Sequence, residues 1–140
     1  NKEELIAACV RRAMQRILKK IEVIDETDVM DALHATLRAY IEESKLHQIL
    51  SVISKVKGEQ STNTQADIAY VKEGHDLLRQ QLFRIMTRAQ QENRLRQDVP
   101  IMAILTVFFT FVDVPNTIGV SNDEWTNILF KIWLEGVKLG

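Results

Sequence analysis

The 140-residue chain has little of several residue types that mark specialised classes of protein. Its single cysteine, Cys9, excludes an internal disulfide framework and a four-cysteine zinc site. Two prolines and five glycines exclude a collagen-like or low-complexity chain. The 18 Lys and Arg residues almost balance the 19 Asp and Glu residues, and the resulting net charge of -1 argues against a free-standing nucleic-acid binder.

Long apolar runs are missing as well. The most apolar stretch, residues 101–112, is shorter than the ~20 residues that a membrane-spanning helix needs. No apolar segment follows a basic N-terminus, so the sequence does not predict a signal peptide. We therefore expect a cytoplasmic protein without membrane contact. The chain does not begin with Met, and we expect Asn1 to be a cut point in a longer protein.

Hydrophobic residues make up 46% of the chain, which suits one globular domain over residues 1–140. Good helix formers are abundant, and apolar residues recur at steps of three and four. This spacing predicts an all-α bundle of about six helices. The expected helices cover residues 2–20, 30–41, 44–58, 65–93, 101–113 and 123–138, with a polar loop over 59–64.

Local signals place several helix starts. Asp28 precedes the second helix, and Ser121 with Glu124 forms a capping box before the last. Asp98, followed by Pro100, is expected to cap the fifth helix. The fifth segment also has the β-branched and aromatic content of a strand. We predict a helix there because a cap precedes it and because a single strand would have no partner.

Residue patterns that carry catalytic chemistry are not found. The glycines form no phosphate-binding loop, and no serine lies in a nucleophile elbow. The histidines at positions 34, 47 and 75 are too far apart for one short zinc motif. Cys9 lies on a predicted helix, where a small buried hydrophobe is expected. We therefore expect no enzyme activity, no cofactor and no metal.

His75 interrupts the apolar stripe of the fourth helix. A buried imidazole needs a hydrogen-bond partner, so His75 is either a satisfied core residue or a polar contact in a ligand cavity. Histidines, aromatic residues and methionines on the predicted inner faces are the candidate lining of such a cavity: Met30, His34, Tyr40, His75, Phe83, Met86 and Phe108.

Three segments together resemble the TetR family of transcriptional regulators. The start, NKEELIAA at residues 1–8, resembles the family's (N/S)KEEL, which opens its fourth helix. Residues 89–98, AQQENRLRQD, resemble the A-x-x-x-G-x-(L/I)-R-x-D turn before the eighth helix. Asn93 takes the place of the usual glycine there and tolerates the left-handed backbone conformation nearly as well. The aromatic last helix resembles the helix that closes the family's dimer interface.

The resemblance implies the ligand-binding and dimerisation domain of such a regulator, with the DNA-binding helix-turn-helix preceding Asn1. It implies a homodimer, a small apolar or amphipathic effector between the helices, and contact with DNA only through the preceding domain. In the family the last two helices of each subunit form a four-helix bundle. On that basis the candidate dimer residues are Phe109, Trp125, Ile128, Leu129, Ile132, Trp133 and Gly136.

Two other functions stay open at this stage. A helical protein–protein adaptor would have a solid core and an exposed apolar groove instead of an internal cavity of several hundred Å³. A helical metalloenzyme would need Asp31, His34 and His75 to converge on one metal ion.

Overall fold

The computed structural model describes residues 2–44 and 62–138, and within them the chain is all-α. The helices are α1 (Lys2–Glu22), α2 (Val29–Glu42), α4 (Thr62–Gln91), α5 (Ile101–Val112) and α6 (Asn122–Val137). In this part of the chain the β-structure is limited to an isolated bridge between Leu95 and Lys138. The all-α prediction is confirmed. The third predicted helix falls almost wholly outside the described residues, so the number six stays a prediction.

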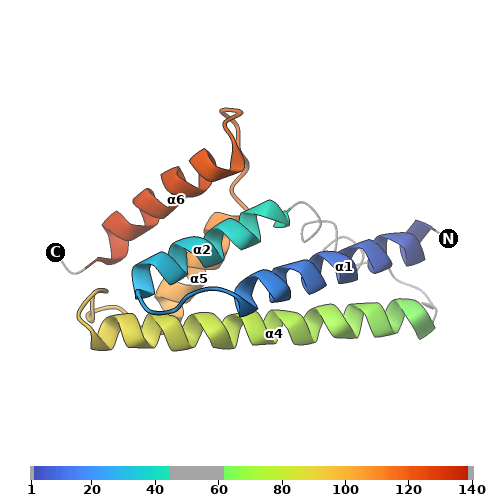
Figure 1. The fold of residues 1–140 in the computed structure, drawn as a ribbon, viewed down its shortest axis with the longest axis horizontal. Coiled ribbons are helices and arrows are strands. Elements are labelled where there is room, and N and C mark those ends of the chain that lie inside the picture. Colours follow the sequence, from blue (N-terminus) through green and yellow to red (C-terminus); the bar gives the residue numbers. More distant parts are fainter. Residues whose placement is uncertain (1, 45–61, 139–140) are drawn as a thin grey trace.

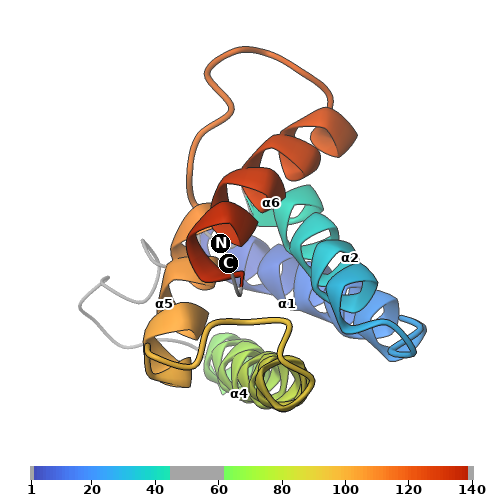
Figure 2. The same ribbon diagram turned by 90° about the vertical axis from the view of Figure 1, so that its left-hand side faces the viewer.

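Helices α1 and α4 lie side by side and run in the same direction (Figure 1). Helices α1, α2 and α5 lie between α4 on one side and α6 on the other (Figures 1 and 2). The middle helix, α2, contacts each of the other four. No described helix is both long enough and apolar enough to cross a membrane.

Side-chain caps fix the starts of α2 and α6 where the sequence predicts them. The Asp28 carboxylate accepts hydrogen bonds from the backbone N–H groups of Met30 (2.9 Å) and Asp31 (3.1 Å). These bonds lower the pKa of Asp28, mainly through the Asp31 N–H. The Ser121 hydroxyl accepts from the Glu124 N–H at 3.1 Å. Both caps satisfy amide groups that a helix leaves unpaired at its first turn.

The predicted cap of α5 is wrong. Pro100, not Asp98, occupies the N-cap position. The Asp98 carboxylate instead accepts two hydrogen bonds from Arg96, at 2.7 and 2.6 Å, and this pairing lowers the pKa of Asp98. The segment from 101 to 112 is nevertheless a helix, as predicted.

Both ends of α4 differ slightly from the prediction. Helix α4 begins at Thr62, so residues 62–64 are helical and do not belong to a loop. It ends at Gln91, and two residues later Asn93 has a φ of 60°. Within the described residues, Asn93 is alone among non-glycine residues in having a positive φ. The left-handed conformation expected at this position is confirmed.

An ion-pair cluster joins the C-terminal halves of α1 and α2. Arg16 donates two hydrogen bonds to the Glu43 carboxylate, at 2.9 and 3.0 Å, and Lys20 pairs with Glu42. The Glu43 side chain is 10% exposed, whereas the Arg16 side chain is 50% exposed. The hydrogen bonds from Arg16 lower the pKa of Glu43 and offset the opposing effect of burial. The pair therefore stabilises the folded chain only while Glu43 is ionised.

Helices α1 and α4 approach closely at Gly74. A Cβ atom added there would lie 2.5 Å from the Met14 sulfur and 2.6 Å from its Cγ. Glycine costs about 1 kcal/mol relative to alanine inside a helix. Here the absence of a side chain is what leaves room for Met14.

The Arg16–Glu43 pair predicts a pH-dependent loss on Glu43→Gln. At pH 7 we expect the free energy of unfolding to fall by about 1 kcal/mol, since one partner is half exposed. The folded pKa of Glu43 lies below the usual 4.5, so its contribution is present above that pH and is lost as the pH falls through the folded value. Urea denaturation at pH 7 and at a series of lower pH values measures this difference.

Glu73→Gln, on the exposed face of α4, is the matched control and should have little effect at either end of the series. A Glu43→Gln deficit that is as large below pH 4 as at pH 7 would contradict the assignment.

The Gly74 contact predicts a background-dependent effect. Gly74→Ala should lower the free energy of unfolding by about 1 kcal/mol, because Met14 must move in a packed site. In a Met14→Ala background the same change should raise it by up to about 1 kcal/mol through helix propensity. Thermal and urea denaturation of the four proteins gives the coupling. Equal effects in both backgrounds would show that the two residues do not constrain each other.

Candidate ligand pocket

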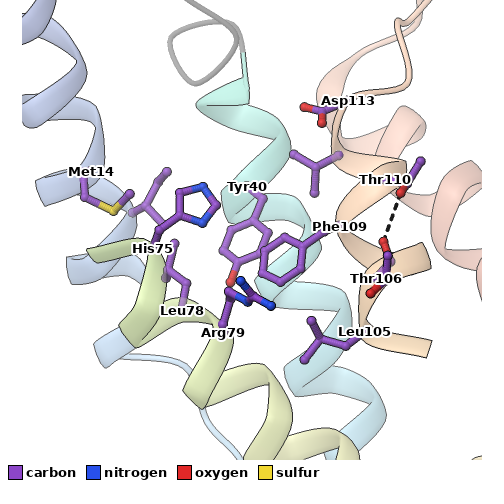
Figure 3. A pocket seen from close by; sticks show the side chains of 12 residues that line it. Met14, Tyr40, His75, Leu78, Arg79, Leu105, Thr106, Phe109, Thr110 and Asp113 are labelled. Carbon is purple, nitrogen blue, oxygen red and sulfur yellow. Dashed lines mark hydrogen bonds between the residues drawn. The ribbon is translucent and has the colours of Figure 1, made fainter. Parts of the chain in front are cut away.

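A cavity of about 360 Å³ lies where α1, α2, α4 and α5 meet (Figure 3). The lining residues are Met14, Ile17, Tyr40, His75, Leu78, Arg79, Leu105, Thr106, Phe109, Thr110, Val112 and Asp113. Most of these side chains are aliphatic or aromatic. The size and the apolar lining are those of a small-molecule site.

Stacked rings form one wall of the cavity. The rings of Tyr40 and Phe109 are nearly parallel, with centroids 5.7 Å apart and an interplanar angle of 9°. The imidazole of His75 is tilted by 33° to the Phe109 ring, with the ring centroids 6.1 Å apart. Three helices, α2, α4 and α5, thus each contribute one ring, and their packing holds the wall in place.

The Tyr40 hydroxyl is buried and has no hydrogen-bond partner among the described residues. The residue is only 4% exposed, and burial raises the pKa of its phenol. The group is therefore a protonated donor at any physiological pH. A buried hydroxyl without a partner costs about 1–3 kcal/mol, and such groups are rare in folded proteins.

The other polar side chains at the cavity differ in whether they already form a hydrogen bond or an ion pair. The hydroxyls of Thr106 and Thr110 donate within α5, to the carbonyls of Met102 (2.7 Å) and Thr106 (3.0 Å). Arg79 and Asp113 are exposed at the rim, and neither has an ion-pair partner in the described part of the chain. The donors not yet used at this site are therefore those of Tyr40 and Arg79.

Of the seven predicted pocket residues, the structure brings Tyr40 and His75 to this cavity. Met86 and Phe108 are fully buried in the core and do not line it. Phe83 is 44% exposed on α4. Met30 is half-buried against the core.

His34, the last of the seven, faces α6. Its Nε2 lies 2.6 Å from the Asn127 side-chain oxygen, and its ring meets Phe130 edge-on at 5.1 Å. Among the described residues no group of three His, Cys, Asp or Glu side chains is placed to hold a metal ion. The proposed convergence of Asp31, His34 and His75 therefore has no support from their positions.

The seven predicted dimer residues differ in how far they are exposed in the single chain. Trp125, Leu129 and Trp133 are at most 9% exposed in the single chain and belong to its own core. Ile128 is half-buried, and Phe109 lines the cavity. Ile132 and Gly136 are exposed and border a shallow groove of about 230 Å³ between α5 and α6, opposite Ala103, Val107 and Phe111.

Sequence reasoning missed Met14, Arg79 and Phe109 as pocket residues. Met14 lies on the buried stripe of α1, and nothing in its spacing distinguishes a core methionine from a cavity wall. Arg79 follows His75 by one helical turn, and this i, i+4 relation was an available signal. Phe109 is a predicted dimer residue because the resemblance places this helix in a four-helix bundle, while the neighbouring Phe108 is the residue predicted to line the cavity; the structure shows the reverse for the cavity.

The unsatisfied hydroxyl predicts that Tyr40→Phe stabilises the ligand-free chain. Removing an unpaired buried donor while keeping the ring should raise the free energy of unfolding by about 1 kcal/mol. Urea denaturation measures it, with Tyr70→Phe as control because that half-buried ring lies under Arg11. A loss of similar size in Tyr40→Phe would mean that the hydroxyl does have a partner.

No protein-family model matches the chain, and no curated protein does. A solved structure of a protein of unknown function from Rhodococcus sp. RHA1 is similar, with a TM-score of 0.60 and 16% sequence identity. The match covers 98% of this chain and 73% of that one. At this identity the likeness concerns the fold alone, and it shows that the helix arrangement seen here occurs in another protein.

Proposed function

We propose that this chain is the effector-binding and dimerisation domain of a TetR-like transcriptional regulator. The observation that carries the proposal is the cavity at the junction of four helices, because its wall includes α1. In the resemblance described above, the α1 segment is the one that directly follows the DNA-binding domain. An effector in this cavity would therefore contact the helix that leads to the DNA-binding domain.

The contact of α1 with the cavity supplies a physical mechanism. Met14 and Ile17 of α1 line the cavity, and Met14 also packs closely against Gly74 of α4. A ligand that displaces Met14 would have to move α1 relative to α4, since the space beside Gly74 is already filled. The effector would shift the DNA-binding equilibrium only by its difference in affinity for the two positions of α1.

The same proposal assigns the exposed face of α5 and α6 to a homodimer. Val107 is 46% exposed and Ile132 is 58% exposed, and both border the groove between the two helices. Exposed apolar surface of this kind marks interaction sites. A second copy related by twofold symmetry would cover both faces at once.

An adaptor that binds another protein through this groove is the second candidate. The exposed Val107 and Ile132 favour it as much as they favour a dimer, but an adaptor gives no role to a cavity with an unpaired hydroxyl. Self-association in the absence of any other protein distinguishes the two.

DNA binding is tested on the protein as its natural gene encodes it, including whatever precedes Asn1. From a random pool of duplexes, that protein should enrich sequences with two inverted half-sites, as expected of a symmetric dimer. The 140-residue chain alone, the matched control, should enrich none. Failure of the full gene product to enrich paired half-sites would overturn the regulator proposal.

The dimer face predicts that Ile132→Asp converts a dimer into a monomer. The residue is exposed in the single chain, so the subunit should still fold, while a charge buried without a partner at the interface should be strongly unfavourable. Sedimentation equilibrium at micromolar concentration measures the mass. Trp133→Asp is unsuitable, because Trp133 is 2% exposed and its loss would unfold the subunit.

Leu77→Asp, at a 54% exposed position on α4, is the matched control and should leave the mass of the dimer unchanged. A parent chain that is monomeric at these concentrations, or a dimer that survives Ile132→Asp, would count against this face.

A further inference from the structure

We infer that the effector is an amphipathic anion whose acidic headgroup, a carboxylate or a group of like chemistry, is bound by Tyr40 and Arg79. The inference deepens the proposed function and rests on it. It concerns the polar chemistry of the cavity, which the proposal of a regulatory domain leaves unspecified.

The first step is the unused donor. The Tyr40 hydroxyl is buried at the cavity with no partner among the described residues, and it can donate one hydrogen bond. A ligand oxygen that accepts a hydrogen bond at that point would use this donor. The neighbouring threonine hydroxyls already donate within α5, so they leave this requirement unchanged.

The second step is the charge that accompanies the donor. Arg79 lines the same cavity, and in Figure 3 its guanidinium points toward the hydroxyl end of Tyr40. A guanidinium has five N–H donors and no acceptor, and its planar fork matches a carboxylate. A cationic group that can only donate, next to a hydroxyl that has a free donor, favours an anionic oxygen group over a cationic one.

Other charged side chains near the cavity could change its preference for an anion. Asp113 is also at the rim, but at the opposite end of the cavity from Arg79, after the last turn of α5 (Figure 3). On the outer face of α4, Lys72, Asp76 and Arg79 line a second pocket beside His75, so one carboxylate there is accompanied by two cationic side chains. Arg79 is therefore the charge that the cavity presents next to the unpaired hydroxyl.

The apolar part of the ligand follows from the rest of the wall. Met14, Ile17, Leu78, Leu105 and Val112 surround the space with aliphatic side chains. Burying apolar ligand surface against them is favourable. A short hydrocarbon chain that carries one acidic group matches both halves of the cavity.

Three probes with one eight-carbon chain test the headgroup: octanoate, octanol and octyltrimethylammonium. Titration calorimetry on the 140-residue chain at pH 7 measures their affinities. We expect octanoate to bind at least about tenfold more tightly than octanol, and octyltrimethylammonium to bind most weakly. Tyr40→Phe and Arg79→Gln should each weaken octanoate binding by about tenfold. Arg79→Gln should leave octanol binding unchanged, because octanol carries no charge.

Two further variants test whether octanoate binds in this cavity and whether the position of the Arg79 charge matters. Arg12→Gln removes the same charge from an exposed position on α1 and should not change octanoate binding. Thr106→Trp places a large ring at the exposed edge of the cavity and should abolish binding of octanoate and octanol alike.

Each alternative result overturns the inference. If octanol binds as tightly as octanoate, the cavity is an apolar effector site that does not recognise an acidic headgroup. The proposed function would be unaffected by that result. Preference for octyltrimethylammonium would assign the headgroup to Asp113. Octanoate binding that survives Thr106→Trp would place the ligand elsewhere, and binding of none of the probes would exclude this ligand class. The proposed function is decided separately, by DNA selection and by the mass of Ile132→Asp.

Discussion

The burial of α2 is the constraint on which the rest of the structure depends. Eight of its fourteen residues are buried, and it contacts the other four described helices. A helix surrounded in this way has room for few polar groups, and each needs a partner. The Thr36 hydroxyl has one, since it donates to the Ala32 carbonyl at 2.7 Å. The Tyr40 hydroxyl has none among the described residues, and the Tyr40 side chain lines a cavity beside α2. The unpaired hydroxyl and the cavity therefore both result from the way in which α2 packs against its neighbouring helices.

The sequence predicts the local features of this fold well because their causes are local. Asp28 and Ser121 cap the helices that follow them, since a cap needs only a side chain within three residues of free amide groups. Asn93 adopts the left-handed conformation for a similarly local reason. The cap at Asp98 fails because a neighbouring side chain, Arg96, competes for the carboxylate. A one-dimensional pattern cannot weigh that competition.

The cavity is harder to predict, because it depends on where several helices leave space. The sequence marks His75 as a polar interruption of an apolar stripe, whereas Tyr40 is a candidate only as an aromatic residue on a predicted inner face. Both carry a polar group that must be reconciled with burial. Phe108 and Met86 carry no such conflict, and they are ordinary core residues. Met14 could not be identified from α1 alone, because its role arises from the missing side chain at Gly74, sixty positions along the chain. A polar group on a buried face was thus informative at Tyr40 and His75 but not at His34, which faces α6.

A continuous series of ring contacts connects the cavity to the face proposed for dimerisation. Phe109 stacks on Tyr40, Tyr40 meets Phe108 edge-on at 6.5 Å, and Phe108 meets Trp133 at 5.2 Å. Trp133 belongs to α6 and borders the groove beside Ile132. Closely packed rings have few ways to shift independently. A ligand that moves Tyr40 or Phe109 would therefore act on α6 as well as on α1.

In the proposed regulator, such a movement would couple the effector to two helices. One is α1, which leads toward the DNA-binding domain, and the other is α6, which would set the angle between the subunits. An adaptor would need neither connection, and this double coupling is the physical reason for preferring the regulator.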